Sequence, residues 1–313
     1  MPPPPASSSV LDAIGNTPLV QLRKVVPPGA ARVFVKLEYY NPTGSYKDRM
    51  ALSTIEGAER RGALRPGMRV VEYTGGSTGS SLALVCAVKG YRFTPISSDA
   101  FAREKLETMR AFGGELIMVP SDGGKITPEL FARFKEAVAR ETAQPGVFWA
   151  DQFNNPDVVE GYAPMGRELL AQVDSGITVF CAAVGSAGML VGVSRALRAA
   201  QCAARIVALE PAESPVLTTG RAGPHRVEGM GVGFRPPHLQ HGDYDEVRTV
   251  READARAMAR RLAREEGIFA GTSTGLNVAA AVEFAVELGP HATVVTVAVD
   301  SGLKYLAGDL YSG

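Results

Sequence analysis

The sequence predicts an α/β fold with two doubly wound, largely parallel sheets, and two observations lead to this prediction. Short runs rich in β-branched residues alternate along the chain with longer runs of helical periodicity. Glycine- and hydroxyl-rich turns follow several of the short runs, as they do where parallel strands pass into helices. We expect strands at residues 33–37, 69–73, 92–97, 115–119, 147–149, 178–183, 205–210, 246–250 and 293–299. We expect helices at residues 46–61, 78–89, 101–112, 128–140, 164–172, 189–200, 252–266 and 276–288.

The 313 residues are expected to form two domains, because two sheets accommodate these strands better than one very wide sheet. Residues 46–157 form the smaller domain, and residues 1–45 with 158–313 form the larger one. The proline- and serine-rich residues 1–9 are expected to be a disordered tail, followed by a turn-rich segment that runs to Gln21.

Composition excludes several classes of protein. The 33 basic residues balance 33 acidic ones, so no overall field attracts nucleic acid or an anionic membrane. No apolar run reaches the roughly 18 residues of a membrane span, and the N-terminus lacks the regions of a signal peptide. Cys86, Cys181 and Cys202 lack metal-binding or redox spacing, so we expect reduced thiols, a cytoplasmic location and no metal site.

The stretch Asn-Pro-Thr-Gly-Ser-Tyr-Lys-Asp-Arg at 41–49 places Lys47 in the first turn of an expected helix. Ser45 is the expected N-cap, and Asp48 completes a capping box of the S-x-x-D type. The free N–H groups and the helix dipole at this end should lower the pKa of Lys47. Such a place suits an amine that must be uncharged or carry an imine. A surface lysine beside a helix cap is the alternative for this stretch alone.

Two strand-to-helix turns have the composition of anion sites. The turn Thr74-Gly75-Gly76-Ser77-Thr78 offers backbone N–H groups and hydroxyls to a carboxylate or phosphate, although a capped tight turn is the alternative. The turn Gly185-Ser186-Ala187-Gly188-Met189 suits a phosphate. A dinucleotide fold competes for this second turn, because Glu210 ends the next strand where such a fold places its ribose-binding acid. The G-x-G-x-x-G fingerprint is incomplete, however.

Two further turns are less specific. The alternating glycines of 229–234, which begin with Gly229, suit close approach to a ligand, a hinge or an irregular surface loop. The hydroxyls of 270–275 are expected to cap the helix that follows. Asp300 and Ser301 follow the last expected strand, where they either orient the residues around Ser273 or cap the next turn.

Taken together, these stretches resemble the fold-type II pyridoxal-phosphate (PLP) enzymes of the cysteine synthase (O-acetylserine sulfhydrylase) and cystathionine β-synthase family. The resemblance runs from Asn16 to Tyr305, nearly the whole chain. Its motifs fall in family order: the lysine stretch 41–49, the Thr74 loop, Gln152-Phe153-Asn154-Asn155-Pro156, Glu210-Pro211, the turn 229–234 and Glu266-Gly267-Ile268.

The resemblance implies roles for the candidate residues. PLP would lie in the cleft between the domains, with Lys47 as its internal Schiff base and the Ser273 hydroxyl at its pyridine nitrogen. Residues Gly185, Ser186, Ala187, Gly188 and Met189 would bind the cofactor phosphate, and Ser77 would stand near the cofactor's phenolic oxygen. Thr74, Gly75, Gly76, Thr78 and Gln152, together with Gly229, would bind the substrate. The smaller domain would be the mobile, substrate-binding one.

The implied activity is β-replacement on an O-activated L-serine. A neutral hydroxyl at the pyridine nitrogen makes the ring a weaker electron sink, which favours prompt loss of a β-leaving group. An α-aminoacrylate then takes up sulfide or another small nucleophile, and Lys47 serves as general base. Such a transferase or lyase would act in cysteine or other amino-acid biosynthesis as a homodimer, and we expect no regulation by haem.

Three alternatives stay open. A serine or threonine dehydratase shares the first half-reaction but hydrolyses the product of β-elimination. A PLP-binding regulatory protein with weak turnover is the second, and a dinucleotide-dependent oxidoreductase, which leaves Lys47 unexplained, is the third.

The chain also departs from the family pattern. The family loop reads T-S-G-N-T-G, whereas this chain has Gly75 at the place of the serine and Ser77 at the place of the asparagine. We therefore expect altered tuning of the Schiff base or altered substrate orientation. In the phosphate loop G-T-G-G-T, Met189 lacks the terminal hydroxyl, so we expect PLP to be held more loosely.

Overall fold

The computed structural model describes residues 6–124, 127–230 and 232–312. The chain folds into two compact units: Met1–Ile14 with Asn41–Gly161, and Gly15–Tyr40 with Tyr162–Gly313. The sequence-based division assigned residues 6–14, 41–45 and 158–161 to the larger domain, whereas the structure groups them with the smaller unit. Leu11, for example, packs against the core of the smaller unit. Ser9 caps the short helix η1 (Val10–Ala13). The first five residues of the expected tail lie outside the described residues.

A six-stranded sheet in the order β1-β2-β10-β7-β8-β9 forms the centre of the larger unit. Every neighbouring pair is parallel except β1 with β2. The short strand β1 lies within the segment expected to be turn-rich, so that expectation was incomplete. The strands are β1 (Leu19–Gln21), β2 (Arg32–Leu37), β7 (Val179–Ala183), β8 (Arg205–Pro211), β9 (Glu246–Val250) and β10 (Thr293–Ala298).

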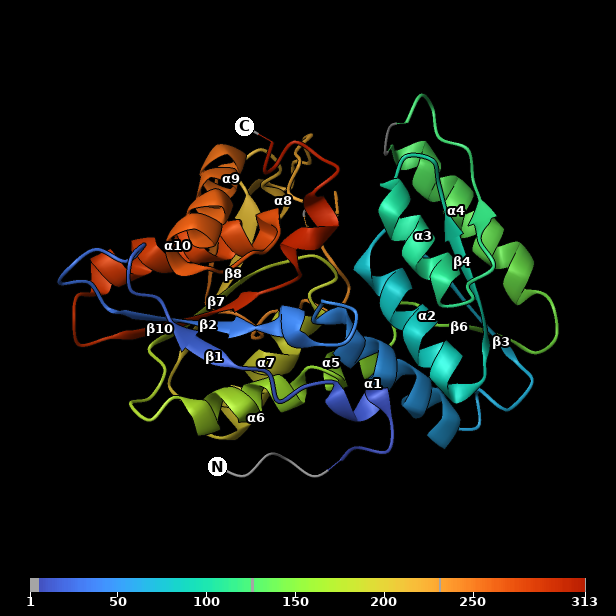
Figure 1. Cartoon of the computed structure of the whole chain (residues 1–313), viewed down its shortest axis with the longest axis horizontal. Helices are drawn as coiled ribbons and strands as arrows, with labels where there is room; N and C mark the ends of the chain where they lie inside the picture. The colour runs from blue at the N-terminus through green and yellow to red at the C-terminus, as the bar shows by residue number, and fades with distance from the viewer. Residues whose placement is uncertain (1–5, 125–126, 231, 313) are drawn as a thin grey trace. The chain divides into compact units, whose positions relative to one another are not determined.

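Helices cover both faces of this sheet, as the doubly wound pattern predicts. Figure 1 shows α9 and α10 on one side of the sheet and α6 and α7 on the other. The helices are α6 (Ala163–Gln172), α7 (Gly188–Ala199), α8 (Val216–Thr219), α9 (Glu252–Arg261) and α10 (Thr272–Leu288), with the short helical segments η2 (Glu38–Tyr40), η3 (Leu262–Glu266) and η4 (Gly302–Tyr305).

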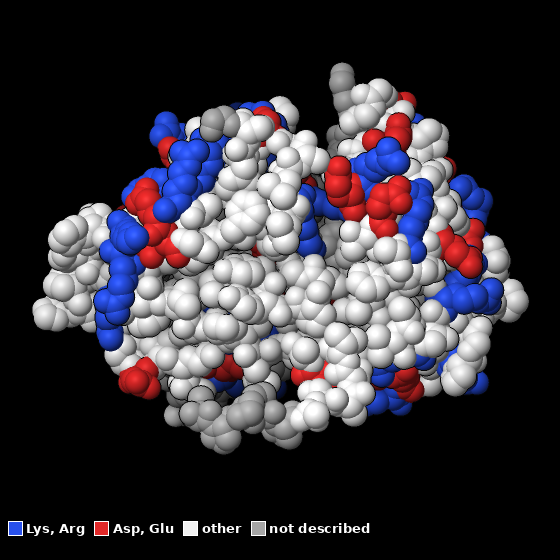
Figure 2. All heavy atoms as spheres, viewed as in Figure 1, with Lys and Arg blue, Asp and Glu red and all other residues white. Residues whose placement is uncertain are grey.

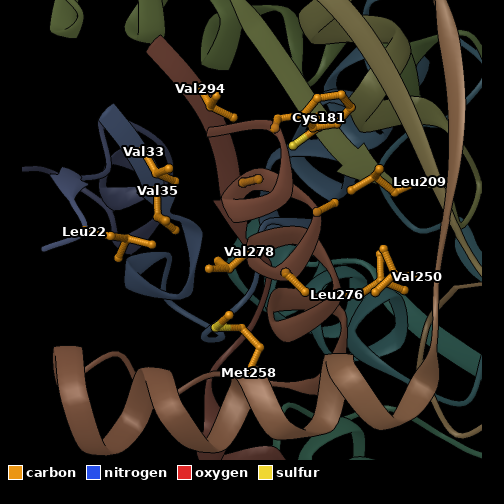
Figure 3. Packing of buried hydrophobic residues seen from close by; sticks show 14 of the residues in the cluster. Leu22, Val33, Val35, Cys181, Leu209, Val250, Met258, Leu276, Val278 and Val294 are labelled. Carbon is orange, nitrogen blue, oxygen red and sulfur yellow. The ribbon is translucent and has the colours of Figure 1, made fainter. Parts of the chain in front are cut away.

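One hydrophobic cluster of the larger unit lies between the sheet and the α9–α10 pair. Val33, Val294 and Leu209 come from three strands and point toward α10, whose Val278 lies among them (Figure 3). Met258 of α9 completes the cluster from the other side of α10. The central strands β7 and β10 are buried along their whole length, and their sequences are short runs of apolar residues and threonine without charge, which is why they could be predicted closely.

The smaller unit contains a four-stranded, fully parallel sheet in the order β5-β4-β3-β6. Its strands are β3 (Arg69–Tyr73), β4 (Arg92–Ser97), β5 (Ile117–Met118) and β6 (Val147–Trp149). Its helices are α1 (Lys47–Arg60), α2 (Ser77–Lys89), α3 (Arg103–Ala111), α4 (Pro128–Thr142) and α5 (Asp157–Glu160). The direction of the right-handed crossovers reverses after β5, so α2 and α3 cover one face and α4 the other. The predicted α/β class with two largely parallel sheets is confirmed.

Acidic and basic side chains are interspersed over the face shown in Figure 2, as the balanced composition predicts. None of the described helices is long and apolar enough to cross a membrane. Cys86 and Cys181 are buried, and burial raises the pKa of each thiol to about 12. Cys202 is only half-buried.

Candidate active site

Lys47 is the first residue of α1, as the sequence predicts, but the start of this helix differs from the expected capping box. Tyr46 occupies the N-cap position without a side-chain capping bond. The Ser45 hydroxyl accepts a hydrogen bond from the Lys47 N–H at 3.2 Å. The Asp48 carboxylate accepts from the N–H and the hydroxyl of Thr43, at 2.8 and 2.5 Å. The predicted capping box is therefore wrong, because Asp48 fastens the preceding loop instead.

The amine of Lys47 lies against an aromatic face. Its Nζ is 4.7 Å from the centroid of the Tyr46 ring. Tyr46 is only 4% exposed, whereas Lys47 is half-buried. A packed ring beneath a long side chain reduces the conformations open to that chain. The Lys47 side chain at the start of α1 is therefore restricted in conformation by the Tyr46 ring.

The turn after β3 has the geometry of a carboxylate site. The Thr74 hydroxyl accepts hydrogen bonds from the N–H groups of Gly76, at 3.3 Å, and Gly79, at 3.2 Å. Helix α2 begins at Ser77 and runs for 13 residues. The first N–H groups of such a helix have no acceptors within the helix, and its dipole is positive at this end. Thr74 thus orders the turn that the sequence analysis predicted to bind an anion.

Gln152 joins this turn from the loop after β6. Its side-chain oxygen accepts a hydrogen bond from the Thr78 hydroxyl at 2.8 Å, and its own side-chain N–H donates to the carbonyl of Tyr73. Within the smaller unit the structure therefore brings together Thr74, Thr78 and Gln152, three residues that the sequence analysis assigned to the substrate.

Glu72 is a residue of this turn that the sequence analysis missed. Its side chain is fully buried at the end of β3, and one carboxylate oxygen accepts from the backbone N–H of Gln152 at 3.1 Å. Burial raises the pKa of Glu72 to about 8. A carboxyl group at the end of an otherwise apolar strand, directly before a ligand turn, was the available signal.

The candidate phosphate loop of the larger unit connects β7 to α7 and is buried throughout. Ala187, at the N-cap of α7, has a φ of 68°, a strained value for a residue with a side chain. A Cβ on Gly185 would lie 2.3 Å from the carbonyl oxygen of Gly229. Only glycine fits there, so the structure brings the candidate phosphate loop and the Gly229 turn into contact. Gly231 of that turn lies outside the described residues.

Ser273 lies in the first turn of α10, which begins at Thr272. The expectation that the hydroxyls of 270–275 cap this helix is wrong, because Gly271 is the N-cap and no side chain caps it. The Thr274 hydroxyl instead accepts from the N–H of Val299 at 2.9 Å. Ser273 is 1% exposed, so its side chain lies in the interior at the start of this helix.

The segment after β10 supports the start of α10. The Tyr305 hydroxyl donates to both carboxylate oxygens of Asp300, at 3.1 and 3.0 Å. The Asp300 carbonyl accepts from the N–H of Gly271 at 3.2 Å. The Ser301 hydroxyl accepts from the N–H of Leu303, so it caps η4. Asp300 thus orients the residues around Ser273, while Ser301 caps the next turn.

Asn277, also missed from sequence, ties α10 to β10 and to the end of β7, the strand that precedes the candidate phosphate loop. Its side chain donates to the carbonyl of Val297 and accepts from the N–H of Ala183, both at 2.8 Å. An asparagine inside a nearly all-apolar helix was the signal for such a buried tie.

Glu210 does not have the role that a dinucleotide fold would give it. Its carboxylate accepts hydrogen bonds from the N–H of Leu217 at 2.6 Å, and from the N–H and hydroxyl of Thr218 at 2.9 and 2.5 Å. This carboxylate is engaged by the first turn of α8, so the dinucleotide interpretation loses its ribose-binding acid.

A family model described as pyridoxal-phosphate dependent enzyme matches residues 10–300. The chain belongs to this family. A cysteine synthase of Staphylococcus aureus (strain N315) is 43% identical over 306 residues, 97% of each chain. The O-ureido-L-serine synthase of Streptomyces lavendulae is 39% identical over 313 residues, 99% of this chain and 94% of the relative. A crystal structure of cysteine synthase from Entamoeba histolytica matches with a TM-score of 0.93 at 33% identity, covering 100% of this chain and 93% of the other.

The residues of this pyridoxal-phosphate dependent enzyme fit its cofactor. Ser186 is 6% exposed and Ser273 is 1% exposed, so both hydroxyl residues are buried. Helix α7 offers its first N–H groups and the positive end of its dipole to a phosphate. Two buried hydroxyl residues, and a helix start beside a position where only glycine fits, are the kinds of group that suit a pyridine nitrogen and a phosphate.

Proposed function

We propose that this PLP enzyme of the cysteine synthase family catalyses β-replacement on an O-activated L-serine. The leaving group departs from Cβ, and a nucleophile adds to the same carbon. The observation that carries the proposal is the position of Ser273, a buried neutral hydroxyl residue in the first turn of α10. A neutral hydroxyl leaves the pyridine nitrogen unprotonated, which favours β-chemistry over transamination.

When bound, PLP draws electron density from the substrate Cα, so that a proton can leave from there and a leaving group from Cβ. We assign to the Lys47 Nζ the covalent hold on the resting cofactor and the removal of the Cα proton. The first N–H groups of α7 hold the phosphate. The Thr74 turn and Gln152 bind the α-carboxylate, and the bond from Thr78 to Gln152 keeps the amide oriented.

A second candidate concerns the nucleophile. The Streptomyces lavendulae relative, 39% identical, is named for O-ureido-L-serine, in which an oxygen atom is joined to the serine Cβ. For this chain we therefore propose two classes of nucleophile, sulfide and an N-hydroxylated urea. The sequence change to Ser77 is the feature that motivates testing the second class.

Absorption spectra of the purified holoenzyme test the proposal. L-serine, O-acetyl-L-serine and O-phospho-L-serine are added separately, followed by sulfide or hydroxyurea, and the products are identified by mass spectrometry. One activated serine should shift the band of the bound cofactor, and one nucleophile should return it with formation of a substituted alanine. Lys47→Ala should abolish turnover while the protein stays folded. Keto acid without a substituted alanine would instead indicate elimination.

We also propose a homodimer in the cytoplasm, on family resemblance alone. Sedimentation equilibrium of the holoenzyme at several protein concentrations tests the dimer, and a monomer throughout would contradict it.

A further inference from the structure

Phe101 covers the glycine at the second position of the candidate carboxylate turn. A Cβ built on Gly75 would lie 2.1 Å from both Cγ and Cδ1 of the Phe101 ring. Because Cγ sits at the near end of the side chain, rotation of the ring about its own axis does not relieve this clash. No side chain fits at position 75 while Phe101 keeps its place.

The glycine at 75 is required by this contact and not by its backbone. Its φ lies outside the left-handed region, so the main chain itself would accept a side chain. The neighbouring Gly76 has nothing within 4 Å of its Cβ position. The ring is therefore matched to one position of the turn.

Phe101 is held in place from two directions. Its ring stacks on Phe134, with centroids 6.2 Å apart and an interplanar angle of 16°, and Phe134 is only 1% exposed. Its backbone N–H donates to the carbonyl of Ser98 at 3.2 Å. The Asp99 carboxylate accepts from the N–H of Ser121 at 2.8 Å, which fastens the same loop to the segment after β5.

Two consecutive glycines would otherwise give the turn wide conformational freedom. On one side, Thr74 holds the N–H groups of Gly76 and Gly79. On the other side, the Phe101 ring occupies the space over Gly75. A turn that is already fixed in this way loses little conformational entropy when a ligand binds, so binding is stronger.

We propose that Phe101 is a positioning residue for substrate binding, whose ring holds the Gly75 turn in the conformation that receives the α-carboxylate. This inference rests on the function proposed above. It predicts that Phe101 acts on substrate affinity and leaves the chemical step nearly unchanged, because the carboxylate is held alike in the ground state and in the transition state.

The first experiment compares Phe101→Ala with Phe131→Ala in the holoenzyme. Phe131 is a matched control, since it is also half-buried and also contacts the Phe134 ring, at 6.1 Å between centroids, but it is not among the atoms nearest to Gly75. Calorimetry measures the dissociation constant of L-alanine, which has the carboxylate but no leaving group. We expect a weakening of about tenfold for Phe101→Ala and less than about twofold for Phe131→Ala, as lost preorganisation predicts.

The second experiment tests the match between positions 75 and 101. Gly75→Ser alone should also weaken binding by about tenfold, because the new side chain displaces the ring. In the double variant Gly75→Ser with Phe101→Ala, the serine enters the space that the ring has left. The double variant should therefore bind L-alanine at least about tenfold more tightly than expected from multiplying the losses of affinity of the two single variants. In Phe101→Ala, KM of the activated serine should rise with the dissociation constant while kcat stays within about threefold of the wild type.

Unchanged binding in Phe101→Ala, equal losses in Phe101→Ala and Phe131→Ala, or strictly multiplicative effects in the double variant would each overturn the inference. If Gly75→Ser does not fold, the comparison of Phe101→Ala with Phe131→Ala decides alone. A wild-type enzyme that binds and converts no amino acid would refute the proposed function instead, so the two failures are distinguishable.

Discussion

Glu72 is a single buried side chain that supports the candidate carboxylate turn through the N–H of Gln152. One of its oxygens accepts from Gln152, while the other, also buried, has no hydrogen-bond partner among the described residues. An ionised carboxylate in this place would lack part of the solvation that it has in water. The raised pKa, about 8, follows from that deficit.

The free energy of unfolding should therefore depend on the charge state of Glu72. Its pKa rises from an ordinary 4.5 to about 8 on folding, so the folded state binds the proton more tightly. Between these two values the unfolded chain ionises while the folded chain does not, and stability falls as pH rises. Glu72→Gln should flatten this part of the profile, measured by urea unfolding of the cofactor-free protein at several pH values. An unchanged slope would contradict the prediction.

The residues that sequence reasoning found and those it missed differ in a physical respect. Lys47 and the Thr74 turn could be predicted, because glycines, hydroxyls and a cap signal mark strand-to-helix turns. Phe101 could not, since its role depends on contact with Gly75, 26 positions earlier in the chain. Its place in the loop after β4, at the carboxyl end of a parallel strand, was the only hint.

Among the elements, α10 explains why one boundary was misjudged. The run Gly-Thr-Ser-Thr-Gly at 271–275 has the composition of a turn, so the helix was expected to begin at residue 276. In the structure it begins at Thr272, because Gly275 packs directly against the backbone of α9. Tertiary packing here outweighs local propensity. In the buried strands, local propensity and tertiary packing favour the same boundaries. Most of these boundaries were therefore predicted within one or two residues.

Gly275→Ala should consequently destabilise the larger unit. Its Cβ would lie 1.9 Å from the carbonyl oxygen of Ala255, a backbone atom that cannot move aside alone. Overpacking of this kind costs about 3 kcal/mol or more. Guanidinium unfolding measures the loss. Val286→Ala, on the same helix at 57% exposure, is the control and should change stability by less than about 0.5 kcal/mol. Equal midpoints for both variants would refute the close packing.

At the scale of the whole molecule, the cofactor is expected to contribute to stability. Removal of PLP with hydroxylamine should lower the midpoint of thermal unfolding, and free PLP at about 100 times its dissociation constant should restore about 2.7 kcal/mol. At equal PLP concentration, the cofactor should raise the unfolding midpoint of Met189→Thr more than that of the wild type. The reason is that the threonine adds a hydroxyl where the family has one. Equal rises of the unfolding midpoint in Met189→Thr and the wild type would refute the expectation that Met189 weakens the binding of PLP.

The pairing of β2 with β10 also has a consequence for how the protein is made. Arg32 lies opposite Thr293, 261 positions later, so β2 leaves the ribosome long before its central partner. The smaller sheet needs only residues 69–149 and can be completed earlier. Contacts between such distant segments form late, and an unpaired strand edge can recruit another chain. A polypeptide stalled before Thr293 therefore carries an open edge, and only completed translation closes it.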